Sequence, residues 1–133
     1  MTTKKIGTII IPPGVFVNVH EKRTADYLAT HLYHDITFLV PNRQKGRRTP
    51  DIEMDGVFWE IKGPKGRSSR TIENNLRAAL RQSPNIILDL RRMDGRTPTQ
   101  KYLQEIERRF NDAKSMKRLI VITKGDFSIA LNR

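Results

Sequence analysis

The chain of 133 residues has no cysteine, which excludes disulfide bonds and any metal site built on thiolates. It also lacks an apolar run near the ~20 residues that a membrane-spanning helix needs, so we expect no membrane partner. The first residues, Met1 to Lys5, carry no signal-peptide pattern. The three histidines have no further histidine or cysteine to complete a zinc site, and surface or helix-end positions are expected for them. The lack of a membrane span and of a signal peptide favours a chain that acts in the cytoplasm, whereas the lack of cysteine leaves the redox compartment open.

Acidic residues are scarce relative to basic ones, with 14 Asp and Glu against 25 Lys and Arg, for a formal net charge of +11. Such an excess predicts a polyanionic partner, and nucleic acid is favoured over a membrane surface. A generically basic protein, or an acidic protein partner, is the alternative on composition alone. The length predicts a single domain over 1–133, with a core at about 18–123.

A β-hairpin is predicted from Pro50 to Lys62, because Asp55-Gly56 separates two runs with the alternation of strands. An Asp-Gly loop favours the type I′ turn, in which both central residues adopt positive φ. This two-residue loop sets the register of the hairpin. The predicted cross-strand pairs are Met54 with Val57, Glu53 with Phe58, Ile52 with Trp59, and Asp51 with Glu60.

Alternation of side chains divides the hairpin into two faces. The apolar face, expected to pack on the core, carries Ile52, Met54, Val57, Trp59 and Ile61. The opposite face carries Asp51, Glu53, Phe58, Glu60 and Lys62. On that second face Asp51 and Glu60 are expected to repel one another, since their Cβ atoms would lie roughly 4.5–5.5 Å apart. A divalent cation between them removes the repulsion, and Lys62 can reach the same place. A surface hairpin with scattered charges is the alternative.

The spacing of Pro50-Asp51 and Glu60-Ile61-Lys62 resembles the signature of the PD-(D/E)XK nuclease superfamily. The resemblance implies that Asp51 and Glu60 bind a divalent metal, Mg²⁺ or another such as Mn²⁺, and that the carbonyl of Ile61 completes the site. It also implies that Lys62 orients the attacking water or helps to deprotonate it.

Glu21 has two interpretations. Many nucleases of the resembled superfamily carry a glutamate on the first helix that is directed at the metal, and Glu21 matches that place. It also follows Asn18 by three residues, which fits the capping box of a helix. The apolar stripe of that helix comprises Ala25, Leu28, Ala29 and Leu32.

The rest of the chain completes the predicted order β-α-β-β-β-α-β-α-β-β. Outside the hairpin, strands are expected at 6–11, 36–40, 85–90, 119–123 and 127–131. A second helix is expected to begin with Ser69 or Thr71 as its cap and to close at Gln82. A third is expected at 97–114, with a capping box from Thr97 to Gln100. This order indicates an α/β sandwich, a mixed central sheet flanked by helices, and the superfamily core is similar.

Two basic loops flank the hairpin and are predicted to contact phosphates, because Lys and Arg neutralise them and glycine lets backbone N–H groups approach. A solvated run of charge is the alternative for both loops. The predicted nucleic-acid-binding residues are Arg43, Lys45, Arg47 and Arg48 before the hairpin, and Lys65, Arg67 and Arg70 after it.

The chain from Glu21 to Asp89 resembles the CdiA C-terminal tRNA-nuclease domains of contact-dependent growth-inhibition systems. The matching segments are the helix that starts at Glu21, Thr49–Asp51, Trp59–Gly63 and Leu80–Asp89. The resemblance implies a metal-dependent endoribonuclease that cuts tRNA in the cytoplasm of a bacterial target cell and that a cognate immunity protein holds harmless. The residues it implies as catalytic are Glu21, Asp51, Glu60 and Lys62, and it implies Gln82, beside the site, as a further nucleic-acid-binding residue.

Several alternatives stay open at this level. Toxin tips of this kind end long exported proteins, so the chain is either an excised domain or a free-standing relative. A DNA endonuclease of resolvase or restriction type would use the same catalytic residues. A non-catalytic nucleic-acid binder would keep the basic loops alone, and RNA could be cut through its own 2′-hydroxyl without a metal. Gln82 also fits a helix C-terminal residue that bonds local carbonyls.

Overall fold

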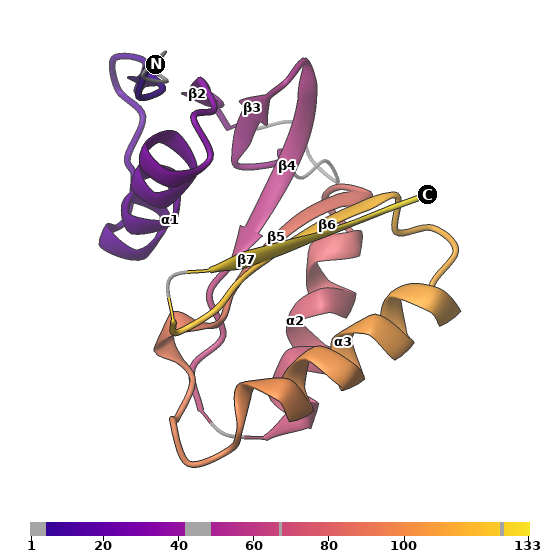
Figure 1. Ribbon diagram of the computed structural model, residues 1–133. Coiled ribbons are helices and arrows are strands. Elements are labelled where there is room, and N and C mark those ends of the chain that lie inside the picture. Colours follow the sequence, from indigo (N-terminus) through magenta and orange to yellow (C-terminus); the bar gives the residue numbers. More distant parts are fainter. Residues whose placement is uncertain (1–4, 42–48, 67, 126) are drawn as a thin grey trace. The chain divides into compact units, whose positions relative to one another are not determined.

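In the computed structural model the described residues are 5–41, 49–66, 68–125 and 127–133. The chain divides into two compact units, the N-terminal unit Met1–Trp59 and the C-terminal unit Glu60–Arg133. The order of helices and strands is the predicted one (Figure 1). Hydrogen bonds link the strands of the described residues in the order β1 to β7, in both parallel and antiparallel pairs. The predicted α/β class with a mixed sheet and flanking helices is therefore confirmed.

The N-terminal unit contains α1 (Val19–His31), β1 (Ile9–Ile10), β2 (Ile36–Phe38), β3 (Ile52–Met54) and the first half of β4 (Val57–Lys62). Strands β1 and β2 are parallel, whereas β3 runs antiparallel to both β2 and β4. Apolar side chains of α1 and of these strands are buried in this unit, namely Ala25, Leu28, Ile36, Phe38, Ile52, Met54 and Trp59.

Strand β1 is shorter than the predicted 6–11 because the chain before it turns to α1. The N–H of Gly7 donates to the carbonyl of Ala29 at 2.9 Å instead of to a strand. A Cβ atom at Gly7 would lie 1.8 Å from the carbonyl oxygen of His34, so a side chain here would force the backbone apart.

The capping box at the start of α1 is confirmed. The N–H of Glu21 donates to Oδ1 of Asn18 at 2.8 Å, and the amide of Asn18 donates back to Oε1 of Glu21 at 3.0 Å. Asn18 therefore satisfies the N–H of Glu21, a backbone donor that the first helical turn leaves without an intrahelical partner, and the return bond joins the two side chains.

The Asp-Gly hairpin also forms as predicted. Asp55 and Gly56 adopt φ values of 57° and 76°, as a type I′ turn requires. Three of the four predicted pairs are present, Met54–Val57, Glu53–Phe58 and Ile52–Trp59. The indole N–H of the buried Trp59 donates to the carbonyl of Met54 at 3.0 Å, which fastens the apolar face of the hairpin.

The C-terminal unit contains the second half of β4 and the following elements: α2 (Ser69–Leu80), β5 (Asn85–Asp89), a 3₁₀ turn η1 (Leu90–Arg92), α3 (Thr99–Asp112), β6 (Arg118–Ile122) and β7 (Ser128–Asn132). Strands β4, β5 and β6 are parallel, and β7 is antiparallel to β6. Every residue of β5 is buried, as its apolar run predicts for an interior strand.

Helices α2 and α3 cover one face of β5 and β6 and form the core of this unit with them (Figure 1). The side chains that meet there include Ile72, Leu76 and Ala79 of α2, Tyr102, Ile106 and Phe110 of α3, and Ile86, Leu88, Leu119 and Val121 of the strands. None of the helices in the described residues is long and apolar enough to cross a bilayer.

Two predicted helix starts are wrong. Helix α2 is capped by Ser68, whose Oγ accepts from the N–H of Arg70 at 3.1 Å, and not by Ser69 or Thr71. Helix α3 begins at Thr99 without the predicted capping box from Thr97 to Gln100. Pro98 is extended, with φ −60° and ψ 138°, so it precedes the helix instead of occupying its first turn, and it has no side-chain oxygen to cap it.

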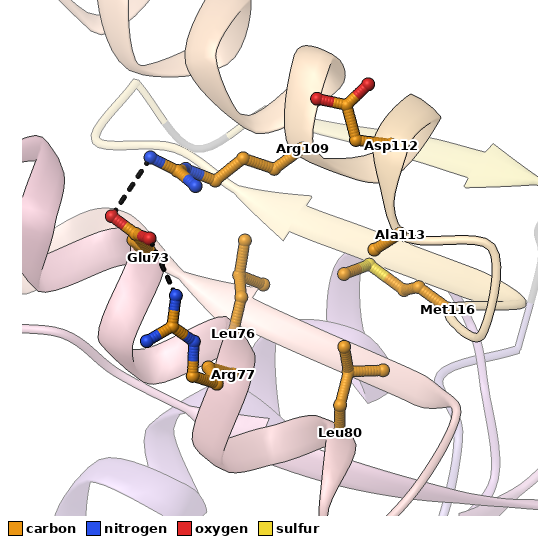
Figure 2. A pocket seen from close by; sticks show the side chains of 8 residues that line it. All are labelled: Glu73, Leu76, Arg77, Leu80, Arg109, Asp112, Ala113 and Met116. Atoms are coloured by element: carbon orange, nitrogen blue, oxygen red, sulfur yellow. Dashed lines mark hydrogen bonds and ion pairs between the residues drawn. The ribbon is translucent and has the colours of Figure 1, made fainter.

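An ion pair joins α2 to α3 at the rim of a groove, and Figure 2 shows Arg109 of α3 reaching Glu73 of α2. Nη2 of Arg109 is 3.1 Å from Oε2 of Glu73, and Nη2 of Arg77 is 2.9 Å from Oε1 of Glu73.

A further ion pair lies within α3. Arg108 donates to Glu105 and thereby holds the pKa of Glu105 below its ordinary value. That pair therefore stabilises the fold above the ordinary glutamate pKa, and its contribution is lost as the pH falls below it.

The groove between α2 and α3 has a volume of about 240 Å³. Its lining combines apolar side chains with the ion pairs at its rim, and comprises Glu73, Leu76, Arg77, Leu80, Arg109, Asp112, Ala113 and Met116.

Arg133 closes the C-terminal end of α3 from the end of β7. Its guanidinium donates to the carbonyls of Phe110, Ala113 and Met116, and it lies 4.3 Å from the centroid of the Phe110 ring. Carbonyls at a helix end have no intrahelical partner, so one cation here satisfies several of them.

We expect Arg133→Ala to lower the free energy of unfolding by about 2 kcal/mol, because hydrogen bonds from a charged group are lost at a helix end. Urea denaturation followed by circular dichroism measures the change. Arg81→Ala is the matched control, since Arg81 is an exposed arginine at the end of α2. Equal losses in both variants would mean that only the charge matters.

We expect Gly56→Ala to cost about 1–2 kcal/mol of stability, because φ of 76° is unfavourable for an L residue with a Cβ atom. The space around Gly56 is open, so the effect isolates backbone strain. Gly95→Ala is the control, because Gly95 also has open space but no positive φ. Thermal melting of both variants tests this, and an unchanged Gly56→Ala melt would refute the strained turn.

Candidate active site

Strand β4 places an acid and a base side by side. Glu60 and Lys62 are two residues apart on the strand, so their side chains share one face. The ammonium of Lys62 lies 3.3 Å from Oε2 of Glu60. Glu60 is only 3% exposed, whereas the side chain of Lys62 is 24% exposed. A carboxylate this deeply buried needs a counter-charge, and Lys62 supplies it from a position that still reaches solvent.

The neighbouring strand explains why Glu60 is buried. In the parallel register Glu60 lies beside Ile86 and Lys62 beside Leu88, and both of these β5 residues are fully buried. Side chains in register point to the same face, so Glu60 lies on the face that α2 and α3 cover. Glu60 is therefore in the core, and Lys62 is at the carboxyl end of β4, where its side chain reaches solvent.

A second acid–base pair lies where β5 ends. Asp89 is buried and accepts three hydrogen bonds from Arg91, from its backbone N–H at 3.1 Å, from Nε at 2.9 Å and from Nη2 at 2.7 Å. The next residue, Arg92, donates from Nη1 to the carbonyl of Gly63 at 3.1 Å. Gly63 directly follows Lys62, so the side chain of Arg92 lies against the backbone that leaves the end of β4.

Backbone contacts tie the two loops beyond these strands. Gly66 forms a parallel bridge with Met93, and the N–H of Asp94 donates to the carbonyl of Gly66. The side chain of Met93 is buried. The loop after β4 is thereby held against the turn after β5.

The predicted catalytic residues fall in both units of the chain. Glu60, Ile61 and Lys62 belong to the C-terminal unit, where the structure brings Glu60 and Lys62 together. Asp51 and Glu21 belong to the N-terminal unit. That these two acids join Glu60 at one metal site stays a prediction, as does the fourth hairpin pair, Asp51 with Glu60.

Asp51 occupies a defined place within its own unit. Its N–H donates to the carbonyl of Trp59 at 3.0 Å, and its carbonyl accepts from Leu39 at 2.9 Å. The residue is half-buried. The capping role of Glu21 is confirmed by the bonds with Asn18, and its metal-directed role stays a prediction.

The predicted phosphate-binding residues are described only in part. Arg43, Lys45, Arg47, Arg48 and Arg67 lie outside the described residues.

The remaining predicted residues lie around α2. Lys65 and Arg70 are both exposed, before α2 and in its first turn. Gln82 is half-buried in the turn after α2, four residues before Ile86, the neighbour of Glu60 on β5.

Two of the histidines make contacts of ordinary structural kinds. His31 stacks on Tyr27 with ring centroids 4.5 Å apart, and His34 pairs with Asp55 at 3.0 Å. In the part of the chain that the structure describes, no group of three or more His, Asp or Glu side chains is placed to hold a metal ion.

Sequence reasoning missed two members of this site. It left Asp89 and Arg92 without a role, although Asp89 ends a buried, mostly apolar strand and Arg92 lies three residues beyond it. Charged residues directly after such a strand were an available signal, because the carboxyl ends of parallel strands are where α/β sheets bind ligands. The contact of Arg92 with Gly63 joins residues 29 apart and has no local signature.

Residues 47–127, more than half of the chain, match the family described as the contact-dependent growth inhibition CdiA C-terminal domain. No curated protein matches the sequence. The fold is similar to that of the CdiA-CT/CdiI toxin and immunity complex from Burkholderia pseudomallei, with a TM-score of 0.67 and 18% identity over 96% of this chain and 100% of that one. The chain therefore belongs to the family of CdiA C-terminal domains, the toxin domains of contact-dependent growth inhibition.

Proposed function

We propose that this toxin domain is a metal-dependent nuclease that hydrolyses tRNA, with Glu60 and Lys62 at its active centre. The observation that carries the proposal is their geometry: a carboxylate 3% exposed with an ammonium 3.3 Å away, two residues apart on one strand. That arrangement fits the Glu-x-Lys half of the PD-(D/E)XK signature. Membership in the CdiA C-terminal domain family adds independent support.

A divalent cation fits the oxygen donors of the chain. Mg²⁺ is commonly held by one or two carboxylates, with water and substrate phosphate as its other ligands. Glu60 and the carbonyl of Ile61 supply two donors from the C-terminal unit, and we propose Asp51 as the second carboxylate, with Glu21 acting through water. Since the described residues hold no three-acid cluster, most remaining ligands would be water and phosphate. When bound, Mg²⁺ or Mn²⁺ supplies Lewis acidity to the scissile phosphodiester.

Lys62 performs the part of the reaction that needs a fixed cation. Glu60 holds its ammonium in place, so its N–H groups can orient a water toward the phosphorus. The same positive charge stabilises the negative charge that develops on the phosphate oxygens. Burial of Glu60 strengthens its attraction for the ammonium of Lys62, because little water screens the carboxylate.

The substrate is proposed from charge and resemblance. A net charge of +11 favours a polyanion, and the exposed Lys65 and Arg70 follow directly after β4. We propose tRNA as that polyanion, because the chain resembles tRNA-cutting CdiA domains. DNA is the second candidate, since hydrolysis of either backbone uses the same groups.

A cognate immunity protein is the proposed protein partner. The similar structure from Burkholderia pseudomallei is a toxin and immunity complex. We propose that a protein of this kind holds the present chain harmless, and that the toxin acts in the cytoplasm of a bacterial target cell, where tRNA is found.

We expect the purified chain to cut bulk tRNA in the presence of Mg²⁺ and EDTA to abolish the cutting, because the phosphate then loses its Lewis acid. Gel electrophoresis of end-labelled tRNA measures the reaction, with supercoiled plasmid incubated in parallel. If plasmid is cut while tRNA stays whole, the substrate is DNA and the tRNA proposal is refuted. Undiminished cutting in EDTA would refute the metal.

We expect Glu60→Gln and Lys62→Met each to lower the rate by about 10²-fold or more, since each removes a charge that acts on the transition state. The control is Glu53→Gln, because Glu53 is an exposed acid on β3 of the same hairpin. Circular dichroism establishes that each variant is folded. Toxicity on expression in bacteria should disappear with Glu60→Gln and persist with Glu53→Gln. A Glu60→Gln variant as fast as the wild type would end the proposal.

A further inference from the structure

We propose that Arg92 is a phosphate-binding residue of the Glu60–Lys62 site, which grips the nucleic-acid backbone next to the bond that is cut. The inference rests on the proposed nuclease function and adds a residue that neither the signature nor the basic loops contain. It follows from the position of Arg92, from its unused hydrogen-bond donors and from the way its turn is held.

The position of Arg92 is set by the backbone that leaves the candidate site. Its Nη1 donates to the carbonyl of Gly63 at 3.1 Å, and Gly63 is the residue after Lys62. A Cβ atom built on Gly63 would lie 3.7 Å from both Cδ and Nη1 of Arg92. The arginine side chain therefore lies close to Gly63, so its charge stays beside the end of β4.

Among the residues that the structure describes, no acid pairs with Arg92. In the same segment Arg91 pairs with Asp89 at 2.7 Å and Arg96 pairs with Asp94 at 3.9 Å. Within the described residues Arg92 makes no ion pair, and its recorded hydrogen bond to Gly63 uses one of its five N–H donors. A guanidinium presents its donors as a planar fork that matches two phosphate oxygens. The remaining donors suit a phosphate group.

The turn that carries Arg92 is held before any ligand binds. Leu90 and Met93 on either side of the arginines are buried. The bridge between Met93 and Gly66 and the bond from Asp94 to Gly66 fix the turn against the loop after β4. Binding a phosphate therefore requires little additional ordering of the backbone, which favours affinity.

Arg92 also lies near the carboxyl ends of two parallel strands, a position in α/β sheets where ligands commonly bind. Strands β4 and β5 are parallel, and Lys62 and Arg92 lie at or just beyond their carboxyl ends. Open α/β sheets bind ligands outside these ends. A purely structural Arg92, which only ties two loops, would stabilise the fold without affecting affinity for nucleic acid, and this difference is measurable.

The test compares Arg92→Ala and Arg92→Lys with Arg96→Ala, which removes an equal charge four residues away from a largely exposed side chain. Fluorescence anisotropy of labelled bulk tRNA in EDTA gives the dissociation constant over a roughly 50–200 mM salt series. Steady-state cleavage with Mg²⁺ gives KM and kcat, and thermal melting reports the stability of each variant.

We expect Arg92→Ala to weaken tRNA binding about fivefold and to reduce the salt slope by about one, because one phosphate contact is lost. KM should rise by a similar factor with a smaller change in kcat. Arg92→Lys keeps the charge but not the fork, so it should recover the salt slope and leave KM raised. If Arg92→Ala does not fold, the KM of Arg92→Lys decides the question.

An Arg92→Ala variant with the affinity and salt slope of Arg96→Ala would overturn the proposal, even if it melted at a lower temperature. The nuclease proposal is judged separately. Wild-type protein that binds tRNA but cuts neither tRNA nor plasmid refutes the nuclease, while the salt slopes still decide for or against a phosphate contact at Arg92.

Discussion

A buried ion pair on β4 is the constraint on which the candidate site depends. Glu60 is a carboxylate at a position where its neighbours on β5 are apolar, and removing a single charge from water costs several kcal/mol unless a partner compensates. Lys62 compensates from 3.3 Å away. Aliphatic side chains of similar volume would suit a stable core as well or better, which is consistent with the catalytic role proposed for this pair.

The strand that carries the pair is positioned by hydrogen bonds on both of its edges. Residues 57–59 of β4 pair with β3, and residues 60–62 pair with β5. The Asp55-Gly56 turn fixes the first pairing, and the buried run of β5 fixes the second. A strand anchored in this way holds side chains more precisely than a loop does, and positioning is a large part of what a phosphodiester-cutting site needs.

Charges of the C-terminal unit are arranged around the ends of the parallel strands. Asp89 holds Arg91, the carbonyl of Gly63 holds Arg92, and Lys62 is held by Glu60. Each of these cations is fixed by an acceptor of its own. In a chain of net charge +11 these cations differ from solvated ones in having fixed positions, as the proposed site requires.

Patterns confined to a few neighbouring residues predicted much of this structure. The hairpin, the capping box of α1 and the buried strand β5 all follow from local turn chemistry or periodicity. The predicted start of α3 is wrong because proline can stand just before a helix or in its first turn. The φ angle of Pro98 is compatible with both places, and only its extended ψ angle puts it before the helix. Contacts between distant parts of the chain, such as Arg133 with the end of α3, leave no local pattern that a single sequence could show.

The same distinction applies to the site. The Glu-x-Lys spacing placed Glu60 and Lys62 together correctly, because residues two apart on a strand share a face. The burial of Glu60 depends on its β5 neighbour Ile86, which is 26 positions further along the chain. The Glu-x-Lys spacing alone could therefore not predict that burial.

Metal binding to the wild type and to Glu60→Gln is the most direct test of the central claim, that the buried carboxylate belongs to a metal-dependent active centre. Titration calorimetry with Mn²⁺ measures it without any substrate. The account predicts one Mn²⁺ bound per wild-type chain and none, or far weaker binding, in Glu60→Gln. Equal stoichiometry and affinity in the two proteins would contradict it.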